Sequence, residues 1–100
     1  MSFVEIGKIL SEKHGFALAH RESVPVKEVF QGKTVWDGIV HVFNLEGHPQ
    51  TDRLYAWWHD TGDPEKPRLV TVLHIHPATT PLSAVRAFIA QEFRNAQTEA

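Results

Sequence analysis

The chain contains no cysteine and only one methionine. Without cysteine there is no disulfide framework, no thiolate nucleophile and no cysteine-ligated zinc, and the composition agrees with a reducing compartment. Basic residues are also few, ten lysines and arginines against twelve aspartates and glutamates. Because proteins that bind nucleic acid usually carry a basic patch, this balance argues against nucleic acid as a partner.

Long apolar runs are missing too. No run approaches the roughly 20 residues that a membrane helix needs, and the start, MSFVEIGKILSEKHGF, lacks the pattern of a signal peptide. We therefore expect no membrane partner and a cytoplasmic location. Glycine-rich phosphate loops and the G-x-S-x-G motif are absent as well. What is present, 100 residues of which 42% are hydrophobic, suits one domain with one core.

Both ends of the chain are predicted to be helical. Ser2 and Glu5 have the spacing of a capping box, and the apolar residues that follow predict a helix over about residues 3–14. A threonine and a proline, suited to the cap and first position of a helix, precede an apolar stripe that predicts a second helix over about residues 81–96.

Between these helices the sequence alternates with period two and is rich in β-branched and aromatic residues. Three strands are expected, over about residues 34–43, 53–60 and 68–76, and residues 26–30 are a candidate for a fourth, at the edge. Their short connections favour antiparallel neighbours. The predicted fold class is therefore α+β, a small single domain with a three- or four-stranded meander between two helices that pack on one face of the sheet.

The order helix, three antiparallel strands, helix is similar to that of the double-stranded-RNA-binding fold. That family grips phosphates with lysines at the start of its last helix, where the segment TTPLSAVRAF offers only Arg86. The resemblance therefore implies a topology and no RNA-binding function, since the charge that would hold phosphate is missing.

Which residues share a face of the sheet depends on the register of the strands. If the turns between the strands are simple, Phe43 lies opposite Arg53. Such turns would also place Asp60 opposite Arg68. One face then holds a set that a helix can cover: Trp36, Gly38, Val40, Val42, Leu54, Ala56, Trp58, Val70 and Val72. The other is also apolar, with Val35, Ile39, Phe43, Tyr55, Trp57, Leu69, Leu73 and Ile75. A bare monomer rarely exposes so large a patch, so segment 16–30, a second copy or a ligand should cover it.

This second face is the main candidate site. We expect a homodimer interface or a site for a small apolar ligand, formed by Ile39, His41, Phe43, Tyr55, Trp57 and Leu73. Adjacent strand residues point to opposite faces, which places Trp58 in the core and Trp57 at the interface. The expected role is a non-enzymatic homodimeric interaction or regulatory module. The alternative is a binding protein for a small apolar or aromatic ligand.

A histidine pair offers a second alternative, a metal-dependent enzyme. His74 and His76 form an H-x-H pattern, which on a strand places both rings on one face about 6.5 to 7 Å apart. Asp52 would lie opposite His76. Two histidines and one carboxylate are a ligand set for Zn or Fe.

Two further pairs could supply a general acid or base. In the assumed register Asp37 faces His59 and His41 faces Tyr55, and a carboxylate beside an imidazole raises its pKa and fixes its tautomer. No nucleophile stands out near either pair, so no catalytic residue is assigned.

Overall fold

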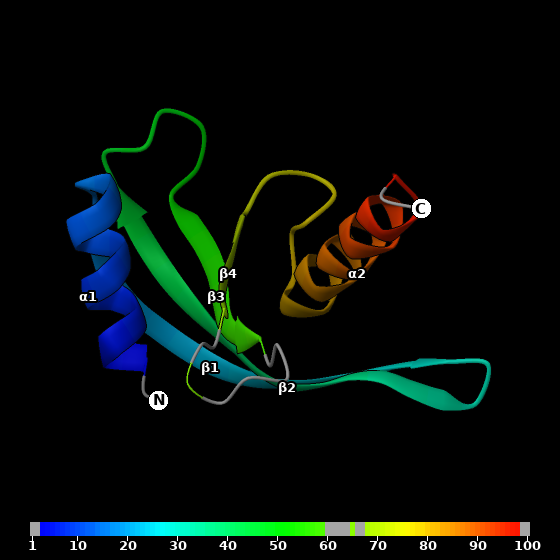
Figure 1. Ribbon diagram of the computed structural model, residues 1–100. Coiled ribbons are helices and arrows are strands. Elements are labelled where there is room, and N and C mark those ends of the chain that lie inside the picture. Colours follow the sequence, from blue (N-terminus) through cyan, green and yellow to red (C-terminus); the bar gives the residue numbers. More distant parts are fainter. Residues whose placement is uncertain (1–2, 60–64, 66–67, 99–100) are drawn as a thin grey trace.

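The computed structural model describes residues 3–59, 65 and 68–98, with side chains as far as residue 94. The elements follow in the order α1 (Phe3–His14), β1 (Ala17–Phe30), β2 (Lys33–Glu46), β3 (Arg53–His59), β4 (Arg68–Leu73) and α2 (Pro81–Thr98). The four strands form one antiparallel sheet in the order β1-β2-β3-β4 (Figure 1). The predicted fold class, an α+β meander between two helices, is confirmed.

β1 is much longer than the edge strand expected at residues 26–30. It begins at Ala17 and tolerates Pro25, since an edge strand does not need every backbone N–H in the ladder. Gln31 and Gly32 join it to β2 with φ values of 51° and 77°, the left-handed geometry of a tight hairpin turn. The outer half of this hairpin, residues 27–38, projects from the rest of the molecule (Figure 1) and is called the arm below.

The strand register differs from the expected one by a single residue at two places. Phe43 lies opposite Leu54, one residue beyond the expected partner. Arg68 lies opposite His59, one residue before the expected Asp60, which lies outside the described residues. Because side chains alternate, each shift turns one strand over relative to its neighbour, and the two shifts cancel for β4. β3 alone therefore shows the opposite faces from those predicted.

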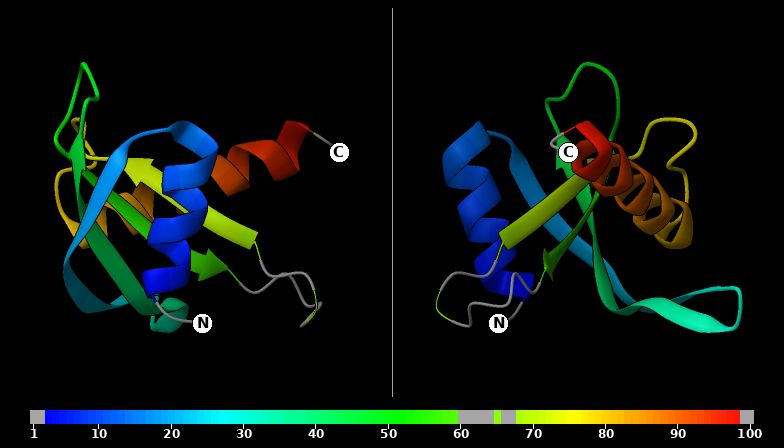
Figure 2. Two further views of the ribbon diagram at one scale, coloured as in Figure 1. Left: turned by 90° about the vertical axis from the view of Figure 1, so that its left-hand side faces the viewer. Right: turned by 45° about the vertical axis from the view of Figure 1, so that its right-hand side comes forward.

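Each helix covers its own face of the sheet, as Figure 2 shows, so the prediction that both pack on one face is wrong. Under α2 lies a core of Val26, Val40, Val42, Tyr55, Trp57, Val70, Ala78, Ala84, Val85 and Phe88. Under α1 lies a second core of Ile6, Leu10, Phe43, Leu45, Leu54 and Ala56. Of the predicted second apolar face, Phe43, Tyr55 and Trp57 are buried within one chain, because each helix covers part of its own face. Val35, Ile39 and Ile75 remain 40–48% exposed.

Candidate interaction surface

The six residues expected to form one site are divided between the two faces. Tyr55 and Trp57 are buried under α2, each only 1% exposed. The remaining four, Ile39, His41, Phe43 and Leu73, occupy strand positions that face α1. The six residues therefore do not share one surface, because the observed register turns β3 over relative to the arrangement that the sequence predicted.

The three proposed metal ligands are not brought together. β4 ends at Leu73, so the alternation that would align His74 and His76 does not continue to them. His74 instead shares a hydrogen bond between its Nδ1 and the Tyr55 hydroxyl, 2.5 Å long. Among the described residues, which include Asp52, no three His, Asp or Glu side chains form a group that could hold a metal ion. The described residues therefore do not show the predicted ligand set for Zn or Fe as a metal site.

The expected acid–base pairs do not form either. These were Asp37 with His59, and His41 with Tyr55. Asp37 lies opposite Lys27 of β1, and His41 lies opposite Ala56 of β3. The one-residue register shift separates both pairs.

Another histidine cluster, which the sequence pattern did not reveal, joins β1 to β2. An irregularity in β1 between His20 and Glu22 changes the alternation and lets residues three apart share a face. Ser23 Oγ lies 2.9 Å from His20 Nε2 and 2.7 Å from His41 Nδ1. Because a hydroxyl has one proton, it donates to one ring and accepts from the other. The ring of Phe3 stacks on His20 with centroids 3.7 Å apart, so the cluster also holds the start of α1.

This cluster predicts a pH dependence of stability. Burial, followed by the proximity of His20, lowers the pKa of His41 below its ordinary value of 6.5. The unfolded chain then binds protons more readily, so the contribution of His41 is complete above pH 6.5 and is lost as the pH falls through the lower folded pKa. We expect His41→Gln to flatten the decline of the unfolding free energy as the pH falls below about 7, measured by urea denaturation.

The matched control is His14→Gln, at an exposed position at the end of α1. It should leave the pH dependence of the wild type in place. A decline that is the same in the wild type and in His41→Gln would refute the assignment.

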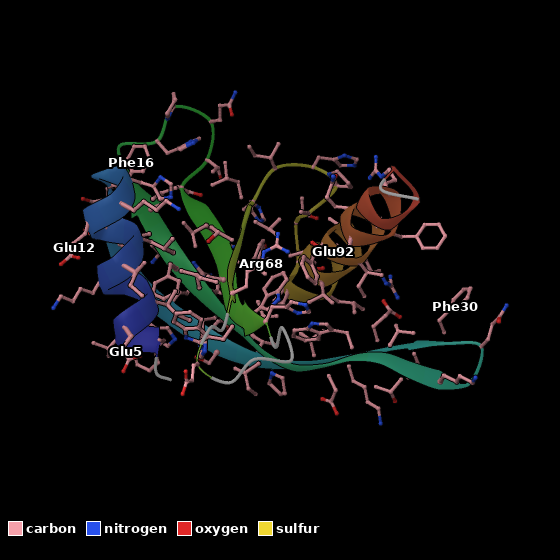
Figure 3. The ribbon with its side chains drawn as sticks, in the orientation of Figure 1. Glu5, Glu12, Phe16, Phe30, Arg68 and Glu92 are labelled. Atoms are coloured by element: carbon pink, nitrogen blue, oxygen red, sulfur yellow. The ribbon has the colours of Figure 1, made fainter. Side chains whose placement is uncertain are left out.

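An apolar groove of about 770 Å³ lies between the arm and α2. Its lining consists of Glu28, Val29, Phe30 and Val35 from the arm and Arg86, Ile89, Ala90 and Phe93 from α2. Phe30 is 64% exposed and Phe93 is 65% exposed, one on each wall. Figure 3 shows Phe30 near the tip of the arm, on the side that faces α2. Large apolar side chains from both walls therefore meet solvent here.

One ion pair bridges the two walls of this groove. Arg86 Nε donates a hydrogen bond to a carboxylate oxygen of Glu28. That hydrogen bond and the guanidinium charge lower the pKa of Glu28, so the carboxyl is ionised at neutral pH. The other lining residues are apolar. Sequence reasoning missed the groove because its walls are more than fifty residues apart in the chain, as Glu28 and Arg86 are.

Comparisons of the chain with protein families, curated proteins and solved structures gave no match. Neither helix in the described part of the chain is both long and apolar enough to cross a membrane. The cytoplasmic location stays a prediction. The function is argued below from the geometry of the surface.

Proposed function

We propose that this protein is an interaction module that forms a homodimer through the groove between the arm and α2. The observation that carries the proposal is the exposure of apolar side chains on both walls, with Val29, Phe30, Val35 and Phe93 each 47–65% exposed. A contiguous apolar surface of this kind is typical of a protein–protein contact. It replaces the sheet face that the sequence pattern suggested for the same role.

The exposed area of the chain supports this proposal. Its accessible surface is 6780 Å², whereas a compact monomer of 11.3 kDa exposes about 5700 Å². The excess of about 1000 Å² means that the chain is less compact than an average monomer of its mass. The radius of gyration, 13.9 Å, likewise exceeds the roughly 13 Å of a compact domain of this length. The projecting arm contributes to both differences (Figure 1).

A twofold dimer uses this groove efficiently. In such a dimer the same patch serves both copies, so the arm of one copy packs on α2 of the other and the reverse contact is identical. Phe30 and Phe93, which a monomer leaves in water, would then be buried against each other's walls. The Glu28–Arg86 pair would lie at the polar rim that surrounds such apolar contacts.

The dimer is tested by Phe93→Glu. We expect the wild type to be a dimer and this variant to be a monomer, because a charge in an apolar contact weakens association by on the order of 100-fold or more. Native mass spectrometry and light scattering after size exclusion give the subunit number. Circular dichroism should show an unchanged fold, since Phe93 is 65% exposed.

The matched control is Val4→Glu, because Val4 is also 65% exposed but lies on α1, on the other side of the sheet. It should remain dimeric. A monomeric wild type, or a Phe93→Glu variant that stays dimeric, would reject the proposal. A monomer that carries an added organic mass would reject it in favour of a small-ligand site.

A further inference from the structure

A second groove, of about 590 Å³, follows the outer edge of β4. β4 is the last strand in the sheet, so within the described residues it has a strand partner on one side only. The groove shares no lining residue with the one between the arm and α2, and α2 lies between the two. This edge is therefore a separate surface from the proposed dimer contact.

The hydrogen-bonding phase of β4 shows which main-chain groups face the groove. In an antiparallel pair the N–H and C=O groups of alternate residues point to opposite sides. The N–H of His74 donates to the C=O of Arg53 at 3.0 Å. In this register the main-chain N–H and C=O groups of the even-numbered residues of β4 therefore point toward β3. The main-chain groups of Leu69 and Thr71 therefore point outward, into the groove.

The two helices form the walls of this groove. α1 contributes Ile9, Leu10, Lys13 and His14, and α2 contributes Ala87, Phe88, Gln91 and Glu92. In the right-hand view of Figure 2, β4 lies between the two helices. A strand placed beside β4 would run about 4.8 Å from it and send alternate side chains toward α1 and toward α2. As far as residues 3–59, 65 and 68–98 show, the groove thus has the form of an unfilled strand position.

The charges of the walls indicate which side chains such a strand would carry. The α1 wall holds the basic residues Lys13 and His14 and no acidic residue. On the α2 wall, Glu92 is paired with Arg68 at 2.9 Å, and the two side chains point toward one another in Figure 3. The rest of that wall consists of Ala87, the largely buried Phe88 and the polar Gln91. Acidic side chains toward α1 and apolar side chains toward α2 complement this arrangement.

We propose that the β4 edge binds an extended, acidic and apolar segment of a partner protein, which adds to the sheet as a fifth strand. Main-chain hydrogen bonds to Leu69 and Thr71 supply affinity, and the two helix walls select alternate side chains. The two helix walls flank β4 on both sides, and a second copy that paired through β4 would bring its own two helices against them. A lone segment therefore fits this edge better than a second copy does.

The experiment uses the full chain and a fluorescent hexapeptide of alternating glutamate and valine, the length of β4. Its comparison peptide alternates lysine and valine. Fluorescence anisotropy should show tighter binding of the glutamate peptide. The variant Thr71→Pro removes one outward N–H, which an edge strand tolerates, and should weaken binding at least about tenfold. Thr71→Ala keeps that N–H and should bind within about threefold of the wild type.

A charge reversal gives a readout that a merely structural change would not produce. Lys13→Glu should weaken the binding of the glutamate peptide and strengthen the binding of the lysine peptide. The dimer variant Phe93→Glu should bind as the wild type does, so failure of one proposal is distinguishable from failure of the other. The strand proposal is overturned if neither peptide binds, if Thr71→Pro binds as tightly as the wild type, or if Thr71→Pro abolishes self-association instead.

Discussion

Replacement of Trp57 by alanine is expected to lower the unfolding free energy by about 3–5 kcal/mol. Trp57 is 1% exposed and sits at the centre of the core under α2. Its ring packs edge-on against Trp36 and Phe88, with centroid distances of 5.7 and 5.6 Å. Small domains have a total stability of only about 5–15 kcal/mol, so the loss should be visible as a large shift of the urea midpoint followed by circular dichroism.

The neighbouring Trp58 is the control, because the two adjacent residues differ in the face they occupy. Trp58 is half-buried on the face of α1, where it packs at the margin of that core. Trp58→Ala should therefore lower the unfolding free energy by clearly less than Trp57→Ala does. The opposite ranking would mean that β3 has the register that simple turns suggest, and that the description of both cores is wrong.

The second large effect is expected for Ile6→Ala, which should lower the unfolding free energy by about 2–5 kcal/mol. Ile6 is 0% exposed, and it and Leu10 are the buried residues of α1. Its side chain holds α1 on the sheet face that contains Phe43 and Leu54. Truncation leaves a cavity there and weakens the cover of an apolar face, which should appear as a lower urea midpoint and as increased binding of an apolar dye.

Ile9→Ala is the matched control for this change. Ile9 is the same residue type in the same helix but is 40% exposed. Its truncation should lower the unfolding free energy by less than about 1 kcal/mol, because little of the buried apolar surface is lost. Equal costs at the two positions would contradict the orientation of α1 on the sheet.

The helix boundaries are the part of the fold that local sequence predicts best. α1 occupies Phe3–His14, the predicted range, and the residue after it, Gly15, has a φ of 74°. At the start of α2, the N–H of Ser83 donates to the Thr80 hydroxyl at 3.1 Å. These signals act between residues a few positions apart, so a window of sequence contains all the atoms involved.

The two candidate surfaces could not be predicted from such short windows of sequence. The arm groove needs β1 to extend far beyond residues 26–30 and to lie beside α2, which follows it by some fifty residues. The β4 groove needs one helix on each side of the sheet. Neither arrangement leaves a periodic trace in the sequence, because periodicity reports the faces of one element and not the partner that covers them.

Strand register marks the boundary between the two kinds of information. The alternation around Tyr55, Trp57 and Trp58 correctly indicates a strand with two apolar faces, and this follows from the sequence alone. Which ring lies under α2 depends on pairing with β2 and β4, where a shift of one residue exchanges the faces and leaves the alternation unchanged. Local hydrogen bonds and side-chain alternation therefore determined the elements. Contacts between distant segments decided the register, the two cores and the surfaces left for partners.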